Sequence, residues 1–215
     1  MGASLRDVRL IGILDPASLG PRALEAARAA EAGGVTLLQL RMKDTGAGEL
    51  LRWTERLVAA LGIPVWVNDR ADVARLGGAA GVHLGQDDVP PRRVRRLMPP
   101  PFGVGVSVGT IAEAERARQA NATYWSLGSV YATGSKPDAG APIGPEGFAT
   151  LVGYAPVGTP CVAIGGVTAV RIPELRAAGA AGVAVIEALF GAADIERAAR
   201  ALRDAMDALG PTTAL

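Results

Sequence analysis

The stretch Gly81-Val-His-Leu-Gly-Gln-Asp-Asp88 joins a short apolar run to two adjacent carboxylates, and a proline-initiated helix is expected directly after it. Slightly earlier, Pro64-Val-Trp-Val-Asn-Asp-Arg70 shows the same order of apolar run, acidic end and helix. Short apolar runs bounded by turn residues are typical of buried strands. The sequence therefore predicts a strand followed by a helix as its repeating unit.

This unit recurs along the whole chain. Strands are expected at 8–14, 35–40, 64–67, 81–84, 103–107, 124–127, 161–164 and 182–186. Helices are expected at 21–32, 47–61, 71–76, 90–98, 111–119, 145–154, 170–178 and 194–209. Small-residue turns of similar sequence at 31–35, 78–82, 119–123 and 178–183 lead into every second strand, which supports this count.

Alternating strands and helices with right-handed crossovers form either a doubly wound sheet or a closed barrel. A dinucleotide-binding sheet would carry G-x-G-x-x-G after its first strand, and residues 15–20 do not. Eight units in about 200 residues favour a compact α/β fold, the (β/α)8 TIM barrel. We expect a single domain over residues 1–215 with a frayed tail at 210–215.

Composition excludes several classes of function. The 215 residues are 49% hydrophobic and 20% charged, with a net charge of +1, so nothing draws the chain to nucleic acid or a membrane surface. No apolar run is long enough to cross a membrane, and the N-terminus lacks the order of a signal peptide. The single cysteine, Cys161, suits a reducing compartment. We expect a cytoplasmic protein that acts on small molecules and can form a homo-oligomer.

Polar residues that could bind a ligand or take part in catalysis lie where the predicted strands end. In a (β/α)8 barrel, the carboxyl ends of the strands carry the active site. Asp69 follows the third strand and Asp88 follows the fourth, and Mg²⁺ prefers one or two carboxylates together with substrate phosphates. The alternatives are that Asp69 pairs with Arg70 and that Asp87-Asp88 only begins a helix, whose dipole favours acid there. The two pairs together favour a metal site.

The cations at this edge suit phosphate. Of 22 cationic residues only Lys43 and Lys136 are lysine, and each lies just beyond a predicted strand. Arg41 and Lys43 share one face of an extended segment. Thr133-x-Ser135-Lys136 lies in the long loop 128–144, whose composition favours a functional lid or phosphate cradle over a plain flexible loop. The glycines of Ile164-Gly-Gly166 and of 182–188 would form a second phosphate site, or only tight turns.

These motifs, taken in order, resemble those of the thiamine-phosphate synthase family. The resemblance rests on Gln39-x-Arg41-x-Lys43, Asn68-Asp69-Arg70, Gly81 to Asp88, Gly105-Val-Ser107, Thr133-x-Ser135-Lys136 and Ile164-Gly-Gly166. It implies a Mg²⁺-dependent transferase that joins 4-amino-2-methylpyrimidin-5-ylmethyl diphosphate to a (carboxy)methylthiazole-ethyl phosphate. The products would be thiamine phosphate and diphosphate, with CO₂ when the thiazole carries a carboxylate, through a dissociative step with a pyrimidine-stabilised carbocation.

The resemblance also implies roles for individual residues. Asp69 and Asp88 would be the Mg²⁺ ligands. The pyrimidine diphosphate would be held by Gln39, Arg41, Lys43, Asn68, Ser107 and Lys136, and the thiazole phosphate by Thr133, Ser135, Gly166, Ile186 and Glu187. Arg41, Lys43, Ser107 and Lys136 are the expected catalytic residues, since cations and hydroxyl groups stabilise charge that develops on the leaving diphosphate.

Departures from the family pattern define the alternatives. Gly109 stands where a histidine is common, Gly128-Ser129 replaces Gly-Pro, Ser135 replaces threonine, and Glu187 replaces a small serine beside the thiazole phosphate. A thiazole tautomerase of the same barrel family would lack Gln86-Asp87-Asp88 and would use the histidine after strand five. This chain has the acidic motif and lacks that histidine, so both differences favour the synthase. A non-catalytic phosphate-ligand-binding barrel is supported only by Glu187 and Gly109.

Overall fold

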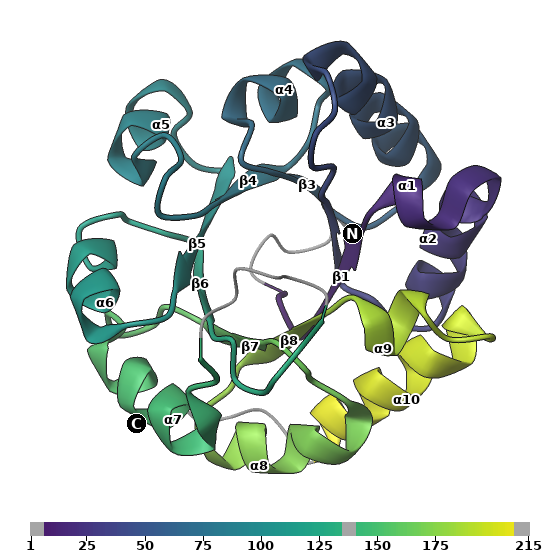
Figure 1. Cartoon of the computed structure of the whole chain (residues 1–215). Coiled ribbons are helices and arrows are strands. Elements are labelled where there is room, and N and C mark those ends of the chain that lie inside the picture. The colour runs from purple at the N-terminus through teal and green to yellow at the C-terminus, as the bar shows by residue number, and fades with distance from the viewer. Residues whose placement is uncertain (1–6, 135–140, 209–215) are drawn as a thin grey trace.

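Eight parallel strands close into a barrel in the order in which they occur in the chain (Figure 1). The computed structural model describes residues 7–134 and 141–208. The strands are β1 Leu10–Leu14, β2 Leu37–Leu40, β3 Val65–Asn68, β4 Gly81–Leu84, β5 Gly103–Val108, β6 Tyr124–Leu127, β7 Cys161–Ile164 and β8 Gly182–Val185. Pairing of β1 with β8 closes the ring, which confirms the predicted (β/α)8 barrel.

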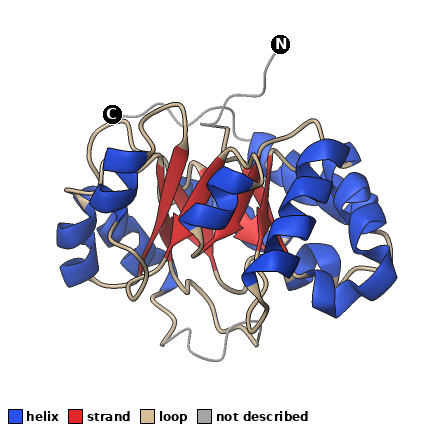
Figure 2. Ribbon diagram, turned by 90° about the horizontal axis from the view of Figure 1, so that it is seen from above, coloured by secondary structure: helices blue, strands red, loops and turns tan. Residues whose placement is uncertain are grey.

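Helices surround the strands on the outside of the barrel (Figures 1 and 2). They are α1 Pro16–Leu19, α2 Ala23–Ala32, α3 Ala47–Ala60, α4 Ala71–Leu76, α5 Pro91–Leu97, α6 Ile111–Ala117, α7 Gly144–Tyr154, α8 Ile172–Ala177, α9 Glu187–Phe190 and α10 Ile195–Asp207, with 3-10 turns at Gly20–Arg22 and Ala169–Arg171. None of the described helices is long and apolar enough to cross a membrane.

Most element boundaries fall within two residues of the prediction, and two short helices are additions. The first, α1, begins after Asp15, whose side chain accepts a hydrogen bond from the backbone N–H of Ala17, and Pro16 occupies its first turn. The second, α9, begins at Glu187 immediately after β8. Both have four residues, which is too short to produce a helical hydrophobic period.

Two layers of side chains form the core. Residues that face outward from the strands pack against the helices, whereas a second cluster that includes Ile11, Trp66 and Tyr124 fills the barrel interior. Glycines on β4 and β5 make room for the large rings. A Cβ at Gly103 would lie 2.0 Å from Cζ2 of Trp66, which is far inside van der Waals contact. These close contacts explain why both strands begin with glycine.

Three expectations fall outside the described residues. Ser135 and Lys136 belong to 135–140, and the expected frayed tail at 210–215 belongs to 209–215. The base of the loop that contains Ser135 is described. Its two ends are joined where Ile143 N–H donates to the Ser129 carbonyl at 2.9 Å and Gly144 N–H donates to the Val130 carbonyl at 3.0 Å.

Candidate functional site

The barrel mouth, meaning the end at which the strands have their carboxyl termini, collects the predicted polar residues. Asp69 is the first residue after β3 and has a φ of 66°, a left-handed conformation that costs most residues about 1–2 kcal/mol but that aspartate tolerates. Its N–H donates to the His83 carbonyl at 2.8 Å, which extends the β3–β4 pairing by one residue. This backbone geometry fixes the position of Asp69 at the mouth.

Asp69 lies beside Asp88, as the sequence predicted for two neighbouring strand ends. Partial burial, a hydrogen bond with Asp88 and repulsion from the Asp88 charge raise the pKa of Asp69 from 3.8 to about 6, whereas the charges of Lys43 and Arg41 act in the opposite direction. The contact with Asp88 shows that the two carboxyl groups converge. The opposing effect of the two cations shows that Arg41 and Lys43 reach the same region.

The two alternative interpretations of these acids do not fit the structure. Arg70 forms its ion pair with Asp72 at 2.6 Å, so it does not neutralise Asp69. The capping residue of α5 is Pro90, and the first turn of that helix contains no acidic residue. Asp88 instead accepts a hydrogen bond from the Gly85 N–H at 2.6 Å, inside the turn that follows β4. Within residues 7–134 and 141–208, neither Asp69 nor Asp88 is therefore taken up in a side-chain ion pair.

The turn after β4 is also attached to β5. The Gln86 side-chain amide donates to the Ser107 carbonyl at 2.7 Å and accepts from Arg116 at 3.2 Å. Because Gly85 and Gln86 are both held, the carboxylate of Asp88 has a defined position. Asn68, the last residue of β3, is half-buried at the same mouth and lies in register with His83.

A chain of polar side chains crosses the barrel interior beneath the mouth, and the sequence did not predict it. The Ser107 hydroxyl lies 2.9 Å from Nε2 of His83, and Nδ1 of His83 lies 2.8 Å from the Tyr124 hydroxyl. The Gln39 side chain hydrogen-bonds the same hydroxyl. Gly105 permits this contact, because a Cβ there would lie 2.7 Å from both His83 and Tyr124. The signal in the sequence was a lone histidine within a predicted strand.

Two backbone segments meet at the carboxyl ends of β6 and β7. Val130 N–H donates to the Ile164 carbonyl at 2.8 Å, and Tyr131 N–H donates to the Gly165 carbonyl at 3.1 Å. Gly166 has a φ of 61°, and a Cβ there would lie 2.7 Å from the Ala132 carbonyl oxygen, so only glycine fits. This pairing brings the segment that carries Thr133 alongside the glycines after β7.

An arginine fastens these two segments together. Arg171 donates to the Gly166 carbonyl at 2.5 Å, and its guanidinium lies 4.2 Å from the centre of the Tyr131 ring. The Tyr131 hydroxyl in turn donates to Glu174 on α8. The loop from β6 and the turn after β7 are thus positioned by the same side chains.

Glu187 begins α9, and its carboxylate lies along that helix. A Cβ added to Gly191 would lie 2.2 Å from Oε1 of Glu187, which places the carboxylate beside the residue four positions later. Ile186 precedes it as the residue that links β8 to α9. The charge of the Glu187 side chain therefore lies toward Gly191 and away from the backbone of Ile186 and Glu187.

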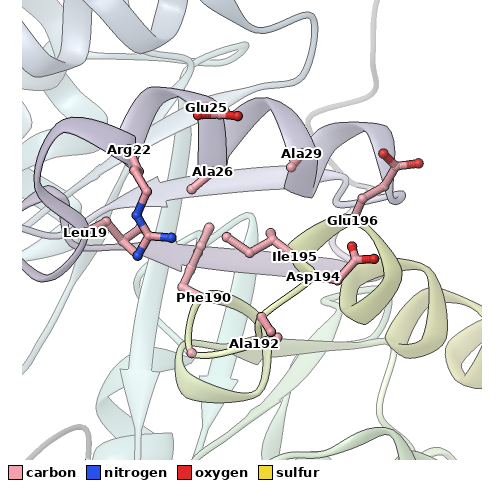
Figure 3. A pocket seen from close by; sticks show the side chains of 12 residues that line it. Leu19, Arg22, Glu25, Ala26, Ala29, Phe190, Ala192, Asp194, Ile195 and Glu196 are labelled. Atoms are coloured by element: carbon pink, nitrogen blue, oxygen red, sulfur yellow. The ribbon is translucent and has the colours of Figure 1, made fainter.

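One hollow lies apart from this group of residues. It has a volume of about 630 Å³ and lies between α2 and the α9–α10 connection, where Arg22, Phe190 and Asp194 line it (Figure 3). None of the predicted site residues that the structure describes lines it. Its lining combines alanines with exposed charges of both signs, which does not provide a set of converging polar groups.

The barrel mouth can hold a divalent cation only if other ligands join its two carboxylates. Asp69 and Asp88 supply two carboxylates, and within the described residues no group of three or more His, Cys, Asp or Glu side chains is placed to hold a metal alone. Mg²⁺ commonly completes its octahedral shell with water and substrate phosphate oxygens. Two converging carboxylates flanked by Arg41 and Lys43 fit a metal ion that arrives with a phosphorylated substrate.

Comparison with known proteins gives one family. A sequence model described as thiamine monophosphate synthase matches residues 10–189. A thiamine-phosphate synthase of Roseiflexus sp. is 45% identical over 88% of this chain and 81% of its own length. A thiamine-phosphate synthase of Agrobacterium fabrum is 38% identical over 94% of this chain and 95% of its own.

Solved structures agree with the sequence relatives. Thiamine phosphate pyrophosphorylase from Pyrococcus furiosus superimposes with a TM-score of 0.85 at 33% identity, covering 95% of this chain and 98% of that one. A 3-hexulose-6-phosphate synthase superimposes with a TM-score of 0.66 at 23% identity, covering 92% and 99% of the two chains, and shows a shared fold alone.

Proposed function

The chain belongs to the thiamine monophosphate synthase family and is an enzyme, a transferase of alkyl or aryl groups, and we propose that its transfer reaction depends on Mg²⁺. The substrates are 4-amino-2-methylpyrimidin-5-ylmethyl diphosphate and a (carboxy)methylthiazole-ethyl phosphate. The products are thiamine phosphate and diphosphate. The observation that carries the proposal is the convergence of Asp69 and Asp88 next to two cations at the barrel mouth.

In this proposal Asp69 and Asp88 hold the metal ion. A Mg²⁺ ion held there would supply positive charge that stabilises the leaving diphosphate. Both carboxyl groups must then be ionised, and Arg41 and Lys43 favour that state of Asp69. Lys43 offers a compact point charge to the diphosphate, whereas Arg41 offers a planar pair of donors.

The remaining residues divide between the two substrates. Gln39, Asn68, Ser107 and Lys136 hold the pyrimidine diphosphate together with Arg41 and Lys43. Thr133, Ser135, Gly166 and the backbone at Ile186 and Glu187 hold the thiazole phosphate. The pairing of the β6 and β7 exits supports this second group, since it brings the loop that carries Thr133 beside Gly166.

The reaction breaks one bond before it forms another. The C–O bond between the pyrimidine methylene carbon and the diphosphate breaks, and its electron pair leaves with the diphosphate. The methylene cation is stabilised by the aminopyrimidine ring. The thiazole nitrogen then donates its electron pair to form the new C–N bond. A 2-carboxylate on the thiazole, when present, leaves as CO₂, and the electron pair left on C2 takes a proton from water. Arg41, Lys43, Ser107 and Lys136 stabilise the charge on the leaving group.

Two rival functions are less well supported. A tautomerase of the same barrel would have no use for the acidic pair at Asp69 and Asp88, and the curated relatives are named as synthases. A non-catalytic binding barrel gained support from Glu187, whose charge would repel a phosphate. Because that carboxylate lies beside Gly191, Glu187 gives little support to a non-catalytic barrel.

The two-substrate assay tests the proposal. Purified protein with Mg²⁺ and both substrates is expected to release diphosphate and form thiamine phosphate, and omission of any one component or addition of a chelator should abolish product. Isomerisation of the thiazole without diphosphate release would identify a tautomerase. Tight binding of one phosphorylated ligand without turnover would identify a binding protein. We also propose a cytoplasmic location, since the single cysteine suits a reducing compartment.

A further inference from the structure

The buried chain of side chains beneath the mouth links two residues assigned to the same substrate. Gln39 on β2 and Ser107 on β5 lie at its ends, and Tyr124 on β6 and His83 on β4 lie between them. Gln39, His83 and Tyr124 are 3%, 6% and 1% exposed, so these hydrogen bonds are shielded from water. Buried polar chains of this kind fix the orientation of every member.

With a neutral imidazole, such a chain runs in one of two directions, because each hydroxyl and the imidazole has one hydrogen to donate. In the first direction the Gln39 amide donates to Tyr124, the Tyr124 hydroxyl donates to Nδ1 of His83, and Nε2–H of His83 donates to Ser107. In the second direction every bond is reversed, and the Ser107 hydroxyl hydrogen is used on His83. The direction therefore decides what Ser107 presents at the mouth.

We infer that the chain runs from Gln39 to Ser107, so that Tyr124 and His83 act as positioning residues that leave the Ser107 hydroxyl hydrogen directed at the substrate. Ser107 then serves as a hydrogen-bond donor to an acceptor atom of the pyrimidine diphosphate. The diphosphate offers only acceptor oxygens, which a donating Ser107 suits, whereas in the reverse direction Ser107 could only accept, as from the 4-amino group. The inference rests on the proposed function for the assignment of substrate contact to Ser107.

Two observations show that the chain is held in a fixed arrangement. Burial raises the pKa of Tyr124, so its hydroxyl keeps its proton and has one hydrogen to donate. The rings of His83 and Tyr124 also lie nearly parallel, with centres 5.6 Å apart and an angle of 24° between their planes. Stacking and hydrogen bonding together restrain the imidazole against rotation.

The tautomer of His83 tests the direction without any assay of activity. His83 is the only histidine of the chain, so ¹⁵N-edited NMR of untagged protein reports on this ring alone. The inference predicts a neutral imidazole with its hydrogen on Nε2. A hydrogen on Nδ1 would show the reverse direction and overturn the inference, even if the protein makes thiamine phosphate. An Nε2–H tautomer in a protein with no synthase activity would instead count against the proposed function alone.

The Tyr124→Phe substitution tests whether the chain positions Ser107 during turnover. It removes one hydroxyl from the interior, and we expect kcat to fall about tenfold while KM for the pyrimidine diphosphate stays within about threefold, as for one hydrogen bond lost from the interior. The Nε2–H tautomer should also cease to dominate. Tyr154→Phe, on a partly buried tyrosine at the end of α7, is the matched control and should change neither quantity. Unchanged kcat and an unchanged tautomer in folded Tyr124→Phe would overturn the inference.

A second pair of variants guards against loss of folding in Tyr124→Phe. His83→Gln keeps an amide N–H that can reach Ser107, whereas His83→Leu has a side chain of similar size without a donor. With thermal unfolding measured for both, we expect kcat of His83→Gln to exceed that of His83→Leu by at least about tenfold. Equal kcat values in two folded variants would show that His83 only fills space.

Discussion

Asp69 is held where its charge is unfavourable in the metal-free protein. Its pKa is raised from 3.8 to about 6 by burial and by the neighbouring Asp88. The folded state therefore binds more protons than the unfolded state between these pH values, and stability falls as pH rises from about 4 to about 6. Such a cost is typical of a site that is completed by a cation.

Asp69→Asn should therefore stabilise the metal-free protein at neutral and alkaline pH. The change removes one of two converging charges, and asparagine also tolerates the left-handed φ of this residue. With a chelator at pH 8, we expect the melting temperature to rise by about 2–4 °C, equivalent to about 1 kcal/mol for a protein of this size. The gain should disappear near pH 4, where Asp69 of the parent protein is protonated.

Asp87→Asn is the control for this measurement, because Asp87 is the exposed neighbour of Asp88 and lies in the same turn. It should leave the melting temperature unchanged at both pH values. A lower melting temperature for Asp69→Asn at pH 8 would contradict the account, since it would mean that the carboxylate stabilises the fold.

Glu187 gives a second prediction at the level of a single residue. The Glu187 carboxylate lies beside Gly191 rather than over the start of α9, so its charge should affect the thiazole phosphate only weakly. We expect Glu187→Gln, which keeps the size and removes the charge, to change KM for the thiazole phosphate by less than about threefold. A fall of tenfold or more in this KM, measured by steady-state kinetics, would show that the carboxylate faces the phosphate.

At the level of elements, side chains of the neighbouring strands β4 and β6 leave room only for glycine at position 105 of β5. A Cβ at Gly105 would lie 2.7 Å from Nδ1 of His83 and from the ring of Tyr124. Gly105→Ala should therefore destabilise the protein by about 1–3 kcal/mol through overpacking, and should lower kcat by displacing His83. Denaturant unfolding and steady-state kinetics measure the two effects.

Gly153→Ala supplies the contrast within α7. Nothing lies within 4 Å of a Cβ at that position, and the helix favours alanine over glycine. We expect it to stabilise the protein by about 0.5–1 kcal/mol with no change in kcat. If the two alanine substitutions had the same effect, the close packing of the barrel interior around β5 would be refuted.

Elements were predictable from the sequence where their patterns were long enough. The strands β4, β6 and β7 have the predicted boundaries, because each is a short apolar run between turn residues. The helices α1 and α9 escaped prediction because four residues carry no periodic pattern, although Asp15-Pro16 marked the start of the first.

For the whole molecule, the count of eight strand–helix units was sufficient to predict the closed barrel, and the barrel predicted where the polar strand ends would meet. The convergence of Asp69 and Asp88 followed from their places after neighbouring strands. The contact between His83 and Tyr124 did not follow, because it depends on the register of three strands and on the absence of a side chain at Gly105. Sequence order predicts which ends meet, but not which interior atoms pair.

The central claim is that an acidic pair at the mouth serves transfer from a diphosphate, and a comparison of two adjacent aspartates tests it most directly. Diphosphate release is measured with Mg²⁺ and both substrates for Asp88→Ala and for Asp87→Ala, with circular dichroism to confirm folding. We predict a loss of at least about 100-fold for Asp88→Ala, because a metal ligand is removed, and a change of less than about threefold for Asp87→Ala. Near-normal release by folded Asp88→Ala, or equal losses in both variants, would contradict the claim.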